Sequence, residues 1–244
     1  MNAWQNASGL TFSEQVQRTE LARRILQLAV PNLGEGLHSD SLTVNGNLSV
    51  FNLSKLTQLP AGLDVKGYLD CRGCESLTQL PEGLRVSSDL DCCGCTSLTQ
   101  IPEGLSVGGD LLCYRCTNLT RLPKRLSIGG HLDCRGCTSL MLLSEKLSLN
   151  GDLDCRGCTN LTQLSEELSI GGNLDCRGCT GLTQLSKDLN VGGSLVCSGC
   201  TRLIQLPERL NIGRDIDCGD CTSLALLPKE LTIRRNLNCR RCRI

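Results

Sequence analysis

A leucine recurs every 21 residues along most of this chain, and this period constrains the fold more than any other feature. The repeating unit is clearest from Leu153 to Asn173, where Leu-x-Cys-x-Gly-Cys is followed by Leu-x-x-Leu, Leu-x-Ile and two glycines. A fixed period of this length predicts a solenoid in which each repeat forms one coil. The sequence predicts about ten coils over residues 41–244, the last of them incomplete. The first residue of the unit occupies ten positions: Leu48, Leu69, Leu90, Leu111, Leu132, Leu153, Leu174, Leu195, Ile216 and Leu237.

Each repeat combines the pattern of a short strand with that of an extended return. Leu-x-Cys alternates at period two, as a strand with one buried face does. The glycine that follows in most repeats, such as Gly157, suits a tight turn at positive φ. Proline or serine after a later leucine, as at Pro81 and Ser165, favours extended or turn geometry over a long helix. We therefore expect a mostly β leucine-rich solenoid with one parallel sheet, one short strand per coil and a turn-rich far side.

The first forty residues lack the repeat. Residues 1–11 are polar and are predicted to be disordered, whereas residues 12–40 are predicted to form a helical N-terminal cap. Thr11 and Glu14 match a capping box, and the apolar residues that follow recur at helical spacing. A cap suits a solenoid because the first coil otherwise leaves its apolar face uncovered.

Charge and cysteine content narrow the choice of compartment. The chain has 25 basic and 25 acidic residues, so its net charge favours neither nucleic acid nor a membrane surface as a partner. Residues 1–11 lack the apolar stretch of a signal peptide, and no run approaches the length of a membrane span. The 19 cysteines are odd in number. We expect free thiols in a reducing compartment and no membrane partner.

The return segments resemble a known family. They contain Leu-Pro-x-x-Leu, and the pattern resembles bacterial leucine-rich-repeat proteins of that type, many of which are effectors delivered into host cells. The resemblance covers about residues 42–244 and implies protein binding, in the cytoplasm or after secretion into a host cytosol. Cysteine replaces the usual asparagine at Cys74 and its equivalents, and without a C-terminal catalytic domain the ubiquitin-ligase activity of some relatives is not implied. The matching segments are Leu80-Pro81-Glu82-Gly83-Leu84, Ile101-Pro102-Glu103-Gly104-Leu105, Leu122-Pro123-Lys124-Arg125-Leu126 and Leu206-Pro207-Glu208-Arg209-Leu210.

Nine Cys-x-x-Cys pairs recur in consecutive repeats from Cys71 to Cys242. The first coil carries Val50 and Leu53 at the same two positions, so these positions accept plain hydrophobic residues. Cysteine packs well as a small buried hydrophobe, and stacked strands about 4.8 Å apart align poorly for disulfides. We expect structural thiols without a cofactor. Two stacked pairs nevertheless have the ligands for zinc or an iron–sulfur cluster, and this alternative would use Cys134, Cys137, Cys155 and Cys158.

The residues expected to face solvent on the sheet form an aspartate row beside an arginine row, which can pair across strands. Four consecutive repeats break this pattern, and both tyrosines of the chain are among the exceptions. Interface centres are rich in tyrosine and poor in charge, whereas drift between repeats would produce a similar break. We predict that another protein binds at Tyr68, Cys93, Leu112, Tyr114 and His131.

The last eleven residues carry five arginines and no acid, so the rest of the chain is net acidic by five. An incomplete last coil leaves an open sheet edge, and like charges there oppose edge pairing between copies. We expect a monomer, with a dimer through this edge as an alternative. Nucleic-acid binding would also use this C-terminal basic edge, formed by Arg234, Arg235, Arg240, Arg241 and Arg243.

Catalytic chemistry has little support in the sequence. The two histidines, His38 and His131, have no recognisable nucleophile and acid near them, and there is no phosphate-binding loop motif. The sequence predicts a non-catalytic protein–protein interaction module, a bacterial effector or an intracellular adaptor. A metal or iron–sulfur carrying protein and a nucleic-acid binder are the alternatives.

Overall fold

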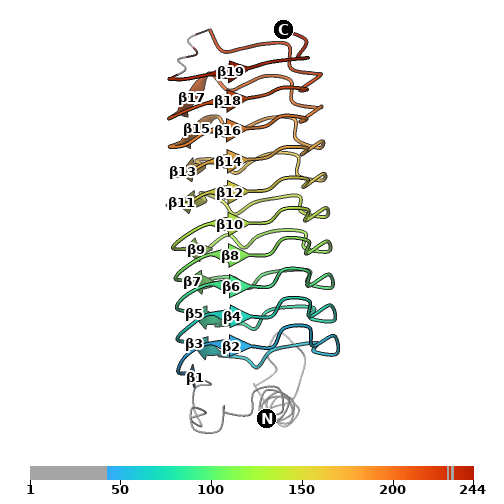
Figure 1. Ribbon diagram of the computed structural model, residues 1–244, viewed down its shortest axis with the longest axis vertical. Helices are drawn as coiled ribbons and strands as arrows, with labels where there is room; N and C mark the ends of the chain where they lie inside the picture. Colours follow the sequence, from blue (N-terminus) through green and yellow to red (C-terminus); the bar gives the residue numbers. More distant parts are fainter. Residues whose placement is uncertain (1–42, 230, 232–233) are drawn as a thin grey trace, which may run out of the picture.

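The computed structural model describes residues 43–229, 231 and 234–244, which form a parallel β-solenoid (Figure 1). The coils stack along one axis, and each front strand lies beside its equivalent in the next coil. Within the described residues no helix occurs, and none could therefore span a membrane. The predicted helical cap, residues 12–40, and the predicted disordered segment, residues 1–11, lie outside the described residues.

Ten short parallel strands form the front sheet within the described residues. Their register follows the 21-residue repeat, so that Leu132 is paired with Leu111 on one side and with Leu153 on the other. The predicted register is therefore confirmed. The front strands are β2 (Leu48–Ser49), β4 (Leu69–Asp70), β6 (Leu90–Asp91), β8 (Leu111–Leu112), β10 (Leu132–Asp133), β12 (Leu153–Asp154), β14 (Leu174–Asp175), β16 (Leu195–Val196), β18 (Ile216–Asp217) and β19 (Leu237–Asn238).

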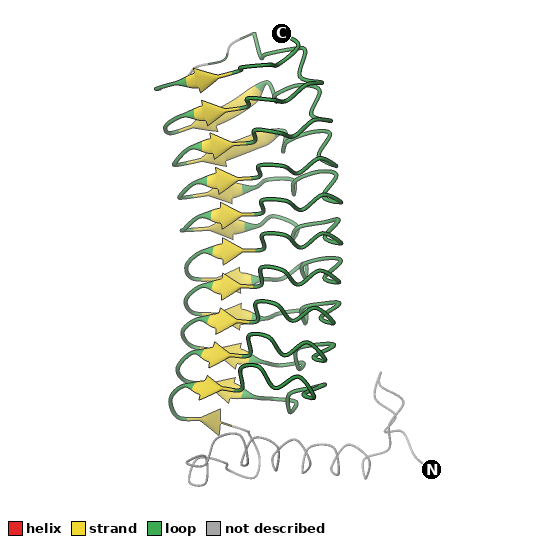
Figure 2. Cartoon of the chain, turned by 45° about the vertical axis from the view of Figure 1, so that its right-hand side comes forward, coloured by secondary structure: helices red, strands yellow, loops and turns green. Residues whose placement is uncertain are grey.

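A second line of strands lies behind the front sheet (Figure 2), so the prediction of one sheet with one strand per coil is wrong. The Leu-x-Val or Leu-x-Ile segment of the return alternates between buried and exposed residues and pairs in register with its neighbours, as a strand does. One rear sheet contains β1 (Thr43–Val44), β3 (Asp64–Val65), β5 (Arg85–Val86), β7 (Ser106–Val107) and β9 (Ser127–Ile128). The other contains β11 (Ser148–Leu149), β13 (Ser169–Ile170), β15 (Asp188–Val191) and β17 (Arg209–Ile212).

The core consists of columns of identical or similar side chains. In the coil that begins at β4, every inward side chain is at most 3% exposed. Since each coil covers the next, this burial continues along the stack, and among the described residues no large aromatic side chain belongs to the core. The inward residues of this coil are Leu69, Cys71, Cys74, Leu77, Leu80, Leu84 and Val86.

A left-handed turn follows each front strand, four residues after its leucine. Gly73 adopts φ 65° and Gly157 adopts φ 68°, as predicted for this position. Arg115 and Asp220 adopt φ 59° at the same position without being glycine. The stack therefore imposes the turn even where the residue does not favour it.

Candidate functional site

The outward side of the front sheet consists of three rows of side chains, set by the 21-residue register. The corner row holds the residue before each front strand, the strand row holds the second strand residue, and the turn row holds the residue two positions later. In the coil of β4 these are Tyr68, Asp70 and Arg72.

Aspartates of the strand row and arginines of the turn row pair as the sequence predicted. Arg72 binds Asp70 at 2.7 Å and reaches Asp91 of the next coil at 3.4 Å. Arg135 and Arg156 repeat this arrangement in later coils. The Arg72 guanidinium holds the pKa of Asp70 below its ordinary value. The carboxylates of these pairs are largely buried, but the guanidinium groups remain partly exposed to solvent, so each pair contributes only modestly to stability. The array chiefly neutralises the face.

The residues of the predicted patch differ in their exposure. Tyr68 is 42% exposed, whereas Leu112 and Tyr114 are half-buried on the same face. Tyr114 stacks under the guanidinium of Arg135, whose central carbon lies 5.2 Å from the ring centre. The expectation that Cys93 faces solvent is wrong, because it is only 4% exposed. Alternation identifies the outward position but does not reveal that this short side chain is covered by its neighbours.

Sequence reasoning missed Phe51, which is 55% exposed. It occupies the turn row one coil before Arg72, and the 21-residue spacing to Arg72 was the signal that could have identified it. With it, every aromatic side chain of the described residues lies on the front face: Phe51, Tyr68 and Tyr114. We call Phe51, Tyr68, Leu112 and Tyr114 the aromatic patch.

The corner row forms a ladder of hydrogen bonds between coils. The side chain of one coil accepts the backbone N–H of the corner residue in the next, as between Asp110 and His131 at 2.7 Å. Eight of the nine steps within the described residues have this bond. The missing step is at Tyr68, whose side chain does not accept the N–H of Asp89. Tyr68 therefore replaces a structural acceptor.

His131 belongs to this ladder. Its Nδ1 atom accepts the N–H of Asp152 at 2.8 Å, while its own N–H is donated to Asp110. The imidazole is half-exposed and lies 3.5 Å from the Asp152 carboxylate. Its acceptor bond gives it a structural role that the predicted partner contact did not include.

The ladder also explains why glycine stands directly before most corner residues. A Cβ atom on Gly109 would lie 2.0 Å from the Asp89 carboxylate oxygen, and one on Gly130 would lie 2.0 Å from that of Asp110. Ser88 occupies this position in the coil that follows Tyr68, where no acceptor approaches. Tyr68 and Ser88 are therefore two parts of one local departure from the repeat.

Two columns of cysteines line the core next to the front sheet. The first column holds the first cysteine of each Cys-x-x-Cys pair, and the second column holds the second. Each second-column thiol donates to a backbone carbonyl of the preceding coil, as from Cys95 to Cys71 at 3.1 Å. The same Cys71 carbonyl accepts the N–H of Cys74 within its own turn. The thiol thus supplies a second donor to a buried carbonyl, which explains cysteine better than packing alone. The donors are Cys74, Cys95, Cys116, Cys137, Cys158, Cys179, Cys200, Cys221 and Cys242.

These thiols are free, and all except Cys239 and Cys242 are buried. The adjoining thiol of Cys95, together with burial, raises the pKa of Cys71 well above its ordinary value. Burial raises the pKa of Cys74 to about 11. Both shifts favour the protonated thiol over the thiolate that attacks disulfides or binds metal.

The alternative metal ligands Cys134, Cys137, Cys155 and Cys158 lie in the same columns. Cys137 and Cys158 donate their thiol protons to carbonyls of the preceding coils, and a thiolate ligand would lose that bond. Over the part of the chain that the structure describes, no group of three or more histidine, cysteine or acidic side chains has an arrangement suited to a metal ion.

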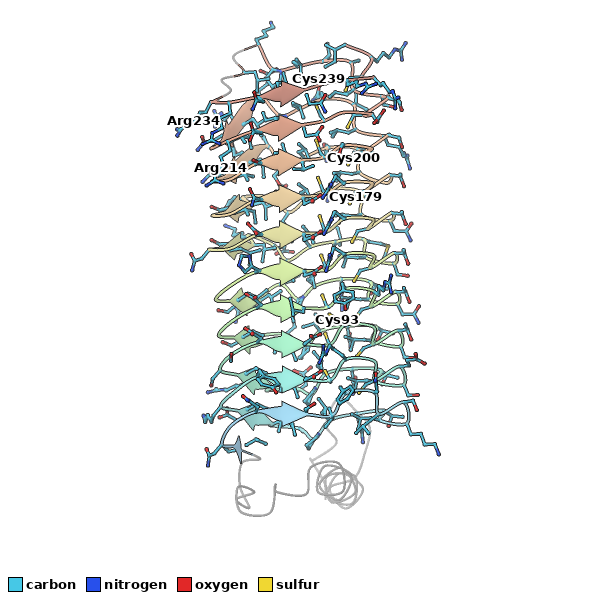
Figure 3. The ribbon with its side chains drawn as sticks, viewed as in Figure 1. Cys93, Cys179, Cys200, Arg214, Arg234 and Cys239 are labelled. Atoms are coloured by element: carbon cyan, nitrogen blue, oxygen red, sulfur yellow. The ribbon has the colours of Figure 1, made fainter. Side chains whose placement is uncertain are left out.

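The C-terminal arginines are exposed, and Arg234 is labelled beside Arg214 in Figure 3. Arg241 pairs with Asp220 at 3.0 Å. Strand β19 lies at one edge of the front sheet and pairs with β18. The remaining members of this basic edge are Arg235, Arg240 and Arg243, which are also exposed.

The rear surface has an irregular region where its strands are interrupted. Within the described residues, β9 and β11 do not pair. Close by is a hollow of about 460 Å³, whose lining includes Leu122, Leu143 and Leu164. The hydroxyls of Ser144 and Ser165 are buried in this region without a hydrogen-bond partner. These serines replace the proline of other repeats, so the region reflects a local change in the repeat.

A scan against protein-family models and a search of curated proteins gave no match to this chain. The function is therefore inferred from the surface. The front face concentrates the aromatic residues and the departures from the repeat, whereas the cysteine columns are committed to the core.

Proposed function

We propose that this chain is a non-catalytic protein-binding scaffold and that its partner contacts the aromatic patch. The observation that carries this proposal is the corner residue Tyr68. A tyrosine there lacks the ladder bond to Asp89, whose net contribution elsewhere is about 0.5–1.5 kcal/mol. An exposed aromatic side chain that replaces a structural acceptor suggests selection for contact rather than for stability.

The rest of the patch supports the same role. Tyr114 and Leu112 stand where other coils place arginine and aspartate, so they replace charge with apolar surface. Tyrosine is enriched in the centres of interfaces, where charge is depleted. From β2 to β8 the patch spans three coil spacings, or about 14 Å. Such a span suits a short segment of another protein.

The proposed relationship is to bacterial leucine-rich-repeat proteins of the Leu-Pro-x-x-Leu type. The regular 21-residue coils and the in-register leucines support it, as do segments such as Leu80–Leu84. In this proposal Cys74 and its equivalents take the place of the family's asparagine, and each thiol donates to a backbone carbonyl of the preceding coil. Action in the cytoplasm or in a host cytosol belongs to the same proposal, because the buried thiols suit a reducing setting.

The test is affinity capture with two variants that each restore the charged repeat. Leu112→Asp with Tyr114→Arg alters the aromatic patch. Val196→Asp with Ser198→Arg makes the same substitutions in equivalent positions of a later coil. We expect partners, identified by mass spectrometry, to be retained by the parent chain and by the later-coil variant but lost from the patch variant. Equal retention by all three proteins would refute the site.

A further inference from the structure

We propose that the aromatic patch receives a segment of another protein that is rich in arginine and lysine. This inference rests on the proposed function and specifies the chemistry of the partner. It follows from the charges that surround the aromatic side chains and from the cations that are missing there.

The front face is most acidic beside the patch. In the coils of β4, β6 and β8 the three rows hold four aspartates against one arginine, whereas the coils of β10, β12 and β14 hold four aspartates against three arginines. The difference arises because Cys93 and Tyr114 take the places of arginine. The four aspartates beside the patch are Asp70, Asp89, Asp91 and Asp110.

Three of these carboxylates are poorly neutralised. Asp91 lies 3.4 Å from Arg72, which is already engaged with Asp70 at 2.7 Å. Among the described residues, no ion pair reaches Asp89 or Asp110. Each of these two accepts one backbone N–H of the next coil, which leaves its carboxylate charge available to a partner.

The aromatic rings fit the same type of ligand. Tyr114 already stacks with the guanidinium of Arg135, so the outward geometry of the turn row can present a ring face to a cation. Within the described part of the chain, no cation lies over the ring of Tyr68, which is exposed one coil before the exposed Asp89. A basic side chain placed there would gain both a ring face and a nearby carboxylate.

The test removes charge without removing the structural hydrogen bonds. Asn47 and Asn173 already act as ladder acceptors. Asn238 accepts the backbone N–H two residues later, as Asp91 and other strand-row aspartates do. Asparagine should therefore replace aspartate at all three positions with little structural change. The patch-charge variant carries Asp89→Asn, Asp91→Asn and Asp110→Asn. The matched control carries Asp152→Asn, Asp215→Asn and Asp217→Asn, which removes two corner-row carboxylates and one strand-row carboxylate in later coils, as the patch-charge variant does beside the patch.

Binding of a fluorescein-labelled oligo-arginine peptide is measured by fluorescence anisotropy at about 50 mM and about 300 mM salt, because screening weakens an exposed charged contact. We expect the patch-charge variant to bind about tenfold more weakly than the parent at low salt, with a smaller salt dependence. The control should remain within about twofold of the parent, and any binding of an oligo-glutamate peptide, for which the exposed C-terminal arginines offer a site, should be unchanged in the patch-charge variant. Equal weakening in both variants, or in neither, would overturn the inference.

Two further readouts separate this inference from the proposed function. If Leu112→Asp with Tyr114→Arg abolishes capture of a partner while the patch-charge variant binds the peptide normally, the basic-segment inference fails and the scaffold function stands. If light scattering shows self-association that the patch-charge variant lacks, the occupant is a second copy of this chain. That result would also overturn the inference.

Discussion

Tyr68→Asn combined with Ser88→Gly should complete the corner ladder. The asparagine would accept the N–H of Asp89, as Asn47 accepts that of Tyr68 at 3.0 Å. That bond should contribute about 0.5–1.5 kcal/mol. Tyr68→Asn alone should gain little, because a Cβ atom at the equivalent Gly109 and Gly130 would lie 2.0 Å from the acceptor oxygen.

The magnitude to measure is the coupling between the two substitutions. Ser88→Gly alone should destabilise the chain by about 0.5–1 kcal/mol, because glycine loses more backbone entropy on folding. The double variant should recover this loss, so the coupling free energy should equal the contribution of the new bond, about 0.5–1.5 kcal/mol in favour of the pair. Urea unfolding of the parent, both single variants and the double variant gives this value directly. Tyr68→Phe, with or without Ser88→Gly, supplies no acceptor and is the control.

Amide hydrogen exchange at Asp89 provides a local measurement. A bond worth about 1 kcal/mol should slow its exchange about fivefold in the double variant relative to Ser88→Gly alone. Arg235 stands where other coils place glycine, directly before the donor Asn236, and the ladder bond from Asn236 to Asp215 is 3.1 Å. The bonds to aspartate or asparagine acceptors are 2.6–3.0 Å where glycine stands before the donor residue. Additive free energies and unchanged exchange at Asp89 would show that Ser88 and Tyr68 are independent and would refute the reasoning.

Three other predictions concern the core and the rear surface. The pKa values of Cys71 and Cys74 are raised above that of an unfolded thiol, so their contribution to stability should be fully present below about pH 9. Above that pH the free energy of unfolding should fall by about 1.4 kcal/mol per pH unit for each thiol that ionises only on unfolding, as urea titrations at several pH values will measure. A thiol reagent should titrate nearly all 19 cysteines after denaturation but few in the native chain, and stoichiometric zinc or iron in the purified protein would contradict this. Ser144→Ala should stabilise the chain by about 1 kcal/mol by removing an unsatisfied hydroxyl, whereas Ser186→Ala should destabilise it by about as much, since its hydroxyl donates to the Ser165 carbonyl. The reverse order in thermal unfolding would contradict this account of the two hydroxyls.

The 21-residue period was sufficient to predict the stack, the register and the inward columns, because any other register would separate the leucines. It was not sufficient to predict the rear strands. Segments such as Ser106–Val107 have only two residues and lie beside glycine-rich corners, so their strand character depends on neighbouring coils. Short-range pattern contains little of that information.

The candidate site was predictable where a side chain differs in kind from its repeat equivalents. Tyr114 and Leu112 are such residues, and the structure places both on the outward face. Cys93 failed because burial depends on what covers a residue as well as on its direction. The ladder was missed because aspartate, asparagine and histidine in one row look like ordinary polar surface residues, although their side chains accept backbone hydrogen bonds from the next coil.

A repeat protein provides its own controls, which makes departures from the repeat informative when their energetic effect is known. Val196 and Ser198 also interrupt the charged rows, but they leave the corner ladder intact, since Ser194 still accepts the N–H of Asp215. At Tyr68 the corner row lacks the hydrogen bond that it forms at every other described step. Ser88 can stand in the place of glycine there, because no ladder acceptor oxygen lies near its Cβ position. Neutral drift explains the first kind of departure without difficulty. It explains the second poorly, because the exchange of a structural acceptor for an exposed tyrosine lowers stability without a compensating contact inside the coil. The compensating contact is therefore expected outside the chain, at the front face between β2 and β8.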